Sequence, residues 1–195
     1  MLNRRTYFIR EHVGHFKLTD TYDILDPEQN EHLGYATETT PKWIQYLRLL
    51  TKKRNTPISL VVRPLNDERP VLRLERGWTF LRSTVNVFDA QNSKIGYFKS
   101  KLFSLGGGFH VYTAADVRVA EVKGNWTGWD FTFVSATGQT IGTVTKKWAG
   151  LGKELFTTAD NYMISLEDMG SMQAASAALL LAAGLAIDAV FNEQH

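Results

Sequence analysis

The sequence predicts a mainly β protein, built as an antiparallel sandwich or barrel. Two observations predict this class: apolar and polar residues alternate with a period of two, and clusters of Asn, Asp and Gly recur at short intervals. Residues 72–75, Leu-Arg-Leu-Glu, and residues 85–87, Val-Asn-Val, show the alternation, which places one face of a strand in a core and the other in water. Short strands separated by turn residues at such spacing are typical of antiparallel sandwiches and barrels.

About a dozen strands are predicted in this way. They lie near residues 6–13, 20–26, 32–38, 58–65, 70–76, 84–90, 94–101, 107–114, 116–123, 130–135, 140–147 and 160–166. Three connections share one pattern, in which a strand and a polar turn are followed by an apolar residue and a glycine: Leu33-Gly34, Ile95-Gly96 and Ile141-Gly142. This recurrence predicts similar hairpins repeated within one sheet.

Two segments predict helices instead. The first runs from Lys42 to about Lys53, and the second from about residue 171 to residue 191. The second segment is apolar on every side, because no charged residue falls in the 19 residues from Met169 to Ile187. A helix of this kind lies either in a protein interior or across a bilayer. Its alanines and Gly184 keep it narrow, which favours the interior, although the membrane span stays open at this point.

Length and composition indicate one domain over residues 1–195. The chain has no cysteine, which excludes disulfides, thiolate zinc sites and cysteine nucleophiles. The motifs of nucleophile elbows, Walker loops and zinc proteases are absent, so we expect no enzyme. The net charge of +2 indicates no nucleic-acid partner, and the first residues lack the apolar region of a signal peptide, so a cytoplasmic protein is expected.

The segment at about 41–55 is an insert with an unusual charge pattern. Residues 41–54 hold five cations and no acid, which leaves the rest of the chain with a net charge of −3. On a helix, one face would hold Trp43, Ile44, Leu47 and Leu50. A basic amphipathic helix with a tryptophan can lie in a membrane interface. The candidate contacts with an anionic phospholipid surface are Lys42, Trp43, Ile44, Leu47, Arg48, Lys52, Lys53 and Arg54. The alternative is a surface helix that packs Trp43 and Leu47 on the sheet.

The last third of the chain carries a family resemblance. The runs Gly-Thr-Val-Thr-Lys-Lys-Trp at 142–148 and Lys-Glu-Leu-Phe-Thr-Thr-Ala-Asp-Asn-Tyr at 153–162, and the helix ending Ile-Asp-Ala-Val-Phe at 187–191, resemble the phospholipid scramblase family. That family looks related to plant LURP-one-related proteins and to the tubby C-terminal domain. The resemblance implies a twelve-stranded antiparallel barrel that encloses the helix at about 171–191. It also implies a scramblase-like protein that is associated with lipid, peripherally on a membrane. A soluble tubby-like barrel that serves as a ligand- or protein-binding scaffold is the alternative.

The same resemblance implies a calcium loop. The family pattern, Asp-x-Asp-x-aromatic-x-Ile with a further Asp at its end, is only partly matched, because Thr158 and Met169 stand at its first and last positions. The candidate calcium ligands are Asp160, Asn161, Glu167 and Asp168. Calcium takes six to eight oxygen ligands, so we expect weak binding or none.

Overall fold

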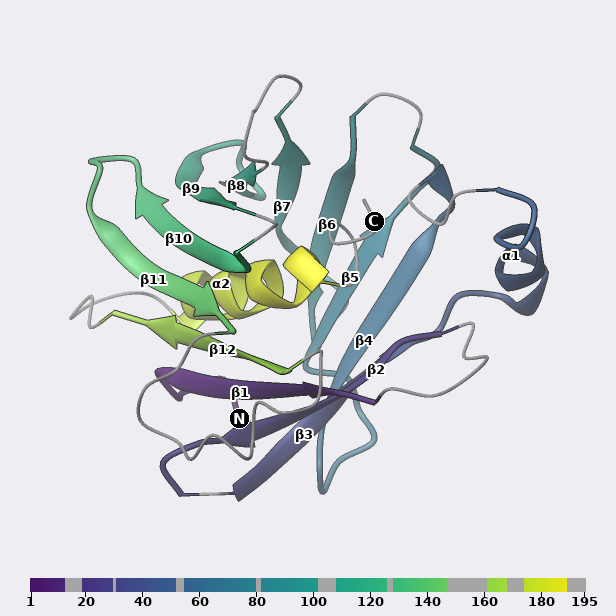
Figure 1. Ribbon diagram of the computed structural model, residues 1–195, viewed down its shortest axis with the longest axis horizontal. Coiled ribbons are helices and arrows are strands. Elements are labelled where there is room, and N and C mark those ends of the chain that lie inside the picture. Colours follow the sequence, from purple (N-terminus) through teal and green to yellow (C-terminus); the bar gives the residue numbers. More distant parts are fainter. Residues whose placement is uncertain are drawn as a thin grey trace.

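The computed structural model describes residues 1–12, 19–29, 31–51, 55–79, 82–101, 108–125, 128–146, 161–167 and 174–188. Within these residues, twelve antiparallel strands close into one barrel around the helix α2, as Figure 1 shows. Each strand pairs with its neighbours in the sequence, and β12 pairs with β1 to close the barrel. The predicted barrel with a central C-terminal helix is thereby confirmed.

The strands agree closely with the predicted runs. Their bounds are β1 Thr6–Glu11, β2 Thr21–Asp26, β3 Glu31–Glu38, β4 Ile58–Pro64, β5 Leu72–Arg76, β6 Thr84–Asp89, β7 Lys94–Ser100, β8 Gly108–Thr113, β9 Arg118–Asn125, β10 Asp130–Ser135, β11 Thr140–Thr145 and β12 Asn161–Leu166. The helices are α1 Lys42–Leu47 and α2 Ala174–Ala186. Along most strands, buried and half-exposed residues alternate, as a barrel with an apolar interior requires.

The repeated apolar-glycine pattern marks a repeated β-bulge. In the three hairpins β2–β3, β6–β7 and β10–β11, the glycine pairs across the sheet and the apolar residue before it is left as the extra residue of the bulge. These residues are Leu33-Gly34, Ile95-Gly96 and Ile141-Gly142. A Cβ atom at Gly34 would lie 2.2 Å from the carbonyl oxygen of Arg63, and one at Gly96 would lie 2.3 Å from that of Tyr112. The glycines therefore allow the next strand to approach closely.

Helix α2 fills the barrel. Its side chains from Leu179 to Ile187 are at most 2% exposed and pack against the inward-facing residues of the strands. The helix must be slim at one point, since a Cβ atom at Gly184 would lie 2.5 Å from Cδ1 of Ile164 on β12. The buried helix is therefore confirmed. Among the residues that the structure describes, no helix combines the length and the hydropathy that a membrane span needs.

The topology places each connection between strands at one of the two ends of the barrel. Because neighbouring strands run in opposite directions, the connections that follow odd-numbered strands all lie at one end. This end carries α1, between β3 and β4, so we call it the α1 end. The connections that follow even-numbered strands lie at the opposite end. Residues far apart in the sequence, such as Trp43, Trp78 and Lys101, thus belong to the same end of the molecule.

Candidate functional site

Helix α1 projects from the side of the barrel at its α1 end (Figure 1). It is a short helix of 6 residues that starts directly after Pro41. A proline at this position suits a helix start, because the first amide groups of a helix have no partner within it. The side-chain amide of Gln45 donates a hydrogen bond of 2.7 Å to the carbonyl of Thr40 and so ties the helix to the end of β3.

Two side chains fix α1 on the barrel. Ile44 is the buried residue of the helix, at 5% exposure. Arg48, which follows the helix, forms an ion pair of 2.6 Å with Glu38, and their side chains are only 5% and 1% exposed. Arg48 also donates hydrogen bonds to Oγ1 of Thr56 at 2.9 Å and to the carbonyl of Pro57 at 2.8 Å. The charge of Arg48 is therefore neutralised inside the fold.

Further polar groups complete this buried network. Glu38 accepts a hydrogen bond of 2.5 Å from the hydroxyl of Thr40, which in turn accepts one of 3.2 Å from the backbone of Ser59. Arg76, buried at the end of β5, donates to the carbonyl of Thr56 at 2.8 Å. Polar groups in such surroundings are costly unless they are paired, so this network holds α1 in one place.

The opposite side of α1 presents large apolar side chains to solvent. Trp43 and Tyr46 are each 62% exposed, and Leu49 and Leu50, just after the helix, are 69% and 85% exposed. We call these four residues the α1 apolar patch. Trp78, on the β5–β6 connection at the same end of the barrel, is a further exposed aromatic residue, at 49% exposure. Contiguous exposed apolar side chains of this kind mark interaction sites for a protein or a membrane.

This placement changes the expected faces of the segment. The predicted helix from Lys42 to about Lys53 ends at Leu47, and Trp43 and Ile44 point to different sides of it. Leu47 is half-buried and Lys42 is exposed, while Arg48 belongs to the buried network instead of the surface. The other predicted contacts, Lys52, Lys53 and Arg54, lie outside the described residues.

Three exposed residues, Tyr46, Leu49 and Leu50, were not among the predicted contacts. Tyr46 lies three residues after Trp43 and four before Leu50, a spacing that puts all three near one side of a continuous helix. That spacing was the available signal. Leu49 lies beyond the end of the helix, so its exposure follows from the local turn and not from a helical pattern.

A cavity of about 280 Å³ lies beside the base of α1. Its polar lining comes from Thr40, Ser59, Glu75, Arg76 and Asn86. Ser59, Glu75 and Asn86 form one row across β4, β5 and β6, since Glu75 pairs with both of the others. Pro41, Pro57, Ile58 and Gly77 complete the lining, so the cavity offers apolar surface together with a few polar groups that could orient a small ligand.

The predicted calcium ligands do not come together. Asn161 is the buried first residue of β12, whereas Glu167 is exposed just beyond the last one. Six residue steps along the strand separate them by about 20 Å, while calcium binds oxygen atoms at about 2.3–2.6 Å. One ion cannot contact both, so Asn161 and Glu167 do not share a calcium site. Asp160 and Asp168 lie outside the described residues, and within these no three His, Asp or Glu side chains are placed to hold a metal.

Comparison with protein families gives one finding. Residues 9–194 match the family model described as Scramblase. The match extends the resemblance seen over residues 142–191 to nearly the whole barrel. Neither the search of curated proteins nor that of solved structures matched this chain.

Proposed function

The chain belongs to the Scramblase family, and on that premise we propose that it is a peripheral phospholipid-binding barrel, which contacts a membrane surface through the α1 apolar patch. The observation that carries this proposal is the exposure of Trp43, Tyr46, Leu49 and Leu50 on a segment that is firmly attached to the barrel. Aromatic rings settle at the headgroup level of a bilayer, and leucines insert just below it.

The geometry favours insertion on energetic grounds. Full burial of a side chain as large as leucine contributes about 1.5–3 kcal/mol, and Leu50 is 85% exposed before any contact. The Glu38–Arg48 pair and Ile44 already order the helix, so little conformational entropy is lost on binding. Lys42, exposed at the start of α1, adds attraction to anionic lipid of about 1 kcal/mol.

The filled interior favours surface binding over transfer through the barrel. Moving a headgroup across a bilayer requires a polar path. The interior holds α2, whose Leu181 and Ala182 are 0% exposed, against the apolar faces of the strands. We therefore propose that phospholipid is bound at the surface of the barrel.

A second candidate is a binding module for a small polar ligand. The cavity of about 280 Å³ beside α1, with Arg76 and Glu75 in its lining, supports this alternative. The two candidates differ in what the exposed apolar side chains do: a ligand-binding module does not need them, whereas membrane contact does.

The test is co-sedimentation with phosphatidylcholine–phosphatidylserine vesicles, followed by salt and carbonate washes. The double variant Trp43→Ser/Leu50→Ser is compared with Leu65→Ser/Val117→Ser, in which exposed apolar residues are removed from the opposite end. We expect the first variant to lose at least tenfold in vesicle affinity and the second to bind as the native chain does. Carbonate should release the bound native protein. Equal binding by both variants would refute the proposal in favour of the ligand-binding module.

A further inference from the structure

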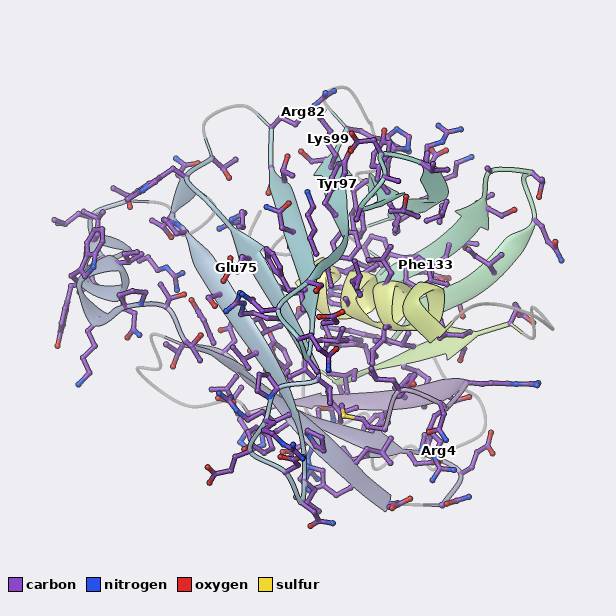
Figure 2. The ribbon with its side chains drawn as sticks, turned by 180° about the vertical axis from the view of Figure 1, so that it is seen from behind. Arg4, Glu75, Arg82, Tyr97, Lys99 and Phe133 are labelled. Carbon is purple, nitrogen blue, oxygen red and sulfur yellow. The ribbon has the colours of Figure 1, made fainter. Side chains whose placement is uncertain are left out.

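A group of cations lies on the outer face of the barrel near its α1 end. Phe98 on β7 is 0% exposed and points inward, so the next residue, Lys99, points outward. Lys101 follows the end of β7, and Lys123 lies on β9 with a side chain 57% exposed. Arg82, exposed just before β6, lies near Lys99 at the top of Figure 2. We call Arg82, Lys99, Lys101 and Lys123 the β7–β9 basic patch.

One carboxylate balances only part of this charge. Glu121 on β9 forms an ion pair with Lys101 and lies 3.9 Å from Nζ of Lys123. The hydrogen bond from Lys101 lowers the pKa of Glu121, so this carboxylate is ionised at neutral pH. It is shared by two lysines and lies about 10 Å across the sheet from the Lys99 position, because β8 runs between them. The patch as a whole is therefore cationic.

His110 lies between the charged side chains of this patch. It occupies the row between Lys99 and Glu121 on the pairing of β7, β8 and β9. Burial lowers the pKa of His110, and the positive charges of Lys101, Arg118 and Arg82 lower it further, although Glu121 opposes them. Two cations of the patch, Lys101 and Arg82, thus lie close enough to act on His110, and Glu121 acts against them.

The β5–β6 connection joins this patch to the α1 apolar patch. On one side, the backbone amide of Thr79 donates a hydrogen bond of 3.1 Å to the carbonyl of Asn55, in the segment that follows α1. On the other, Ser83 and Ser100 at the end of β7 exchange hydrogen bonds of 2.9 Å. The connection itself carries exposed Trp78 and Arg82. Apolar and cationic groups therefore lie on connections at the same end of the barrel.

The opposite end of the barrel is charged differently. Its exposed or half-exposed acids Glu28, Asp67, Glu68 and Asp116 lie beside the exposed cations Arg69 and Lys94, and Arg69 pairs with Asp67. Charges of both signs are thus mixed at this end, whereas the basic patch holds four cations around Glu121, so an anionic surface attracts the patch more strongly, within a Debye length of about 8 Å at physiological salt. The charge distribution thus favours one orientation, with the α1 end toward the surface.

We propose that the β7–β9 basic patch binds the phosphate groups of anionic phospholipids while the α1 apolar patch inserts, so that the barrel docks on an anionic bilayer in one fixed orientation. This inference rests on the proposed phospholipid binding and adds a second, separate contact to it. It assigns the electrostatic part of the contact to residues on β7, β9 and two connections, in place of Arg48, whose charge is neutralised by Glu38.

The experiment measures affinity for phosphatidylcholine vesicles with and without phosphatidylserine. The patch variant is Lys99→Ala/Lys123→Ala, and the matched control is Lys94→Ala/Arg69→Ala, which removes the same charge from exposed positions at the opposite end. Each lysine near an anionic surface is worth about a fivefold change in affinity, so the patch variant should bind anionic vesicles about 25-fold more weakly. Glu121→Gln should strengthen that binding, since it removes the opposing carboxylate. Thermal unfolding checks that every variant is folded.

Three outcomes decide the matter. Loss of anionic binding by the patch variant, with neutral binding and the control unchanged, supports the inference. Equal anionic binding by the patch variant and the control overturns it. Failure of the proposed function looks different, because then Trp43→Ser/Leu50→Ser keeps its affinity for both kinds of vesicle whatever the patch variant does.

Discussion

Replacing Arg48 with methionine should destabilise the whole barrel, because the change removes the cation that pairs with a buried carboxylate. Glu38 is 1% exposed at its side chain and lies 2.6 Å from the guanidinium of Arg48. Methionine keeps most of the apolar length of the side chain and loses every donor. Thr56 and Pro57 then lose the hydrogen bonds that Arg48 donates to them.

The magnitude follows from the burial of both groups. Removing one partner of a buried ion pair costs about 3–5 kcal/mol, whereas a surface substitution changes the free energy of unfolding by about 0.5 kcal/mol or less. For a chain of 195 residues, Tm falls by about 2–4 °C per kcal/mol. Arg48→Met should therefore lower Tm by about 6–20 °C.

The assay is thermal and urea unfolding of a double-mutant cycle. Glu38→Gln combined with Arg48→Met removes both charges, so the double variant should be more stable than Arg48→Met alone. Lys42→Met is the matched control, since Lys42 is an exposed cation of the same helix. An Arg48→Met variant that unfolds within 2 °C of this control, or a double variant without any recovery, would refute the assignment of Arg48 to the interior.

Three further predictions concern the interior, the acid stability and the metal. Leu181→Lys should prevent folding, since an unpaired buried ion costs several kcal/mol, whereas the control Leu181→Met should fold. Circular dichroism distinguishes the two variants. A lysine variant that folds and unfolds at the native midpoint would contradict a buried α2. Burial raises the pKa of Asp23, but hydrogen bonds from Arg10 and His12 outweigh it and lower the pKa below 3.8. Its contribution to stability is thus present above pH 3.8 and lost as the pH falls through the folded-state value, so Asp23→Asn should flatten the stability profile below about pH 4; an unchanged profile argues against this role. Calorimetry at millimolar calcium should show no saturable heat, and a saturable signal abolished by Glu167→Ala would contradict the separation along β12.

The strands could be predicted because their signal is local. The alternation of apolar and polar residues, as at residues 72–75, can be seen within a few consecutive positions. Each strand of the barrel also pairs with its neighbours in the sequence. The apolar-glycine pairs were visible for the same reason. Their role as β-bulges was not, because it depends on how closely the third strand approaches: the carbonyl of Arg63 on β4 lies where a side chain at Gly34 would stand.

The candidate site was predicted only in outline. The sequence indicated a basic segment with a tryptophan at 41–54, and Trp43 is exposed as membrane contact requires. The number of cations in the segment could not show that Arg48 is buried and Lys42 exposed. The carboxylate that pairs with Arg48 lies on β3, before the helix, and the groups that accept its hydrogen bonds, on Thr56 and Pro57, follow the helix. The ion pair between Glu38 and Arg48 is a tertiary contact, which the helical periodicity of a sequence does not predict.

By itself, the sequence determined a dozen short strands, an apolar C-terminal helix and the Scramblase-like motifs of residues 142–191. These are properties of neighbouring residues: strand alternation, hydropathy and short motifs. Only the tertiary structure decided that α2 lies inside the barrel, that Asn161 and Glu167 lie apart, and that Lys99 and Lys123 share a face. The physical reason is barrel closure. Once the antiparallel register sets which strands are neighbours and which end each connection occupies, distant residues become adjacent, and their charge and burial are fixed by partners that the local sequence does not contain.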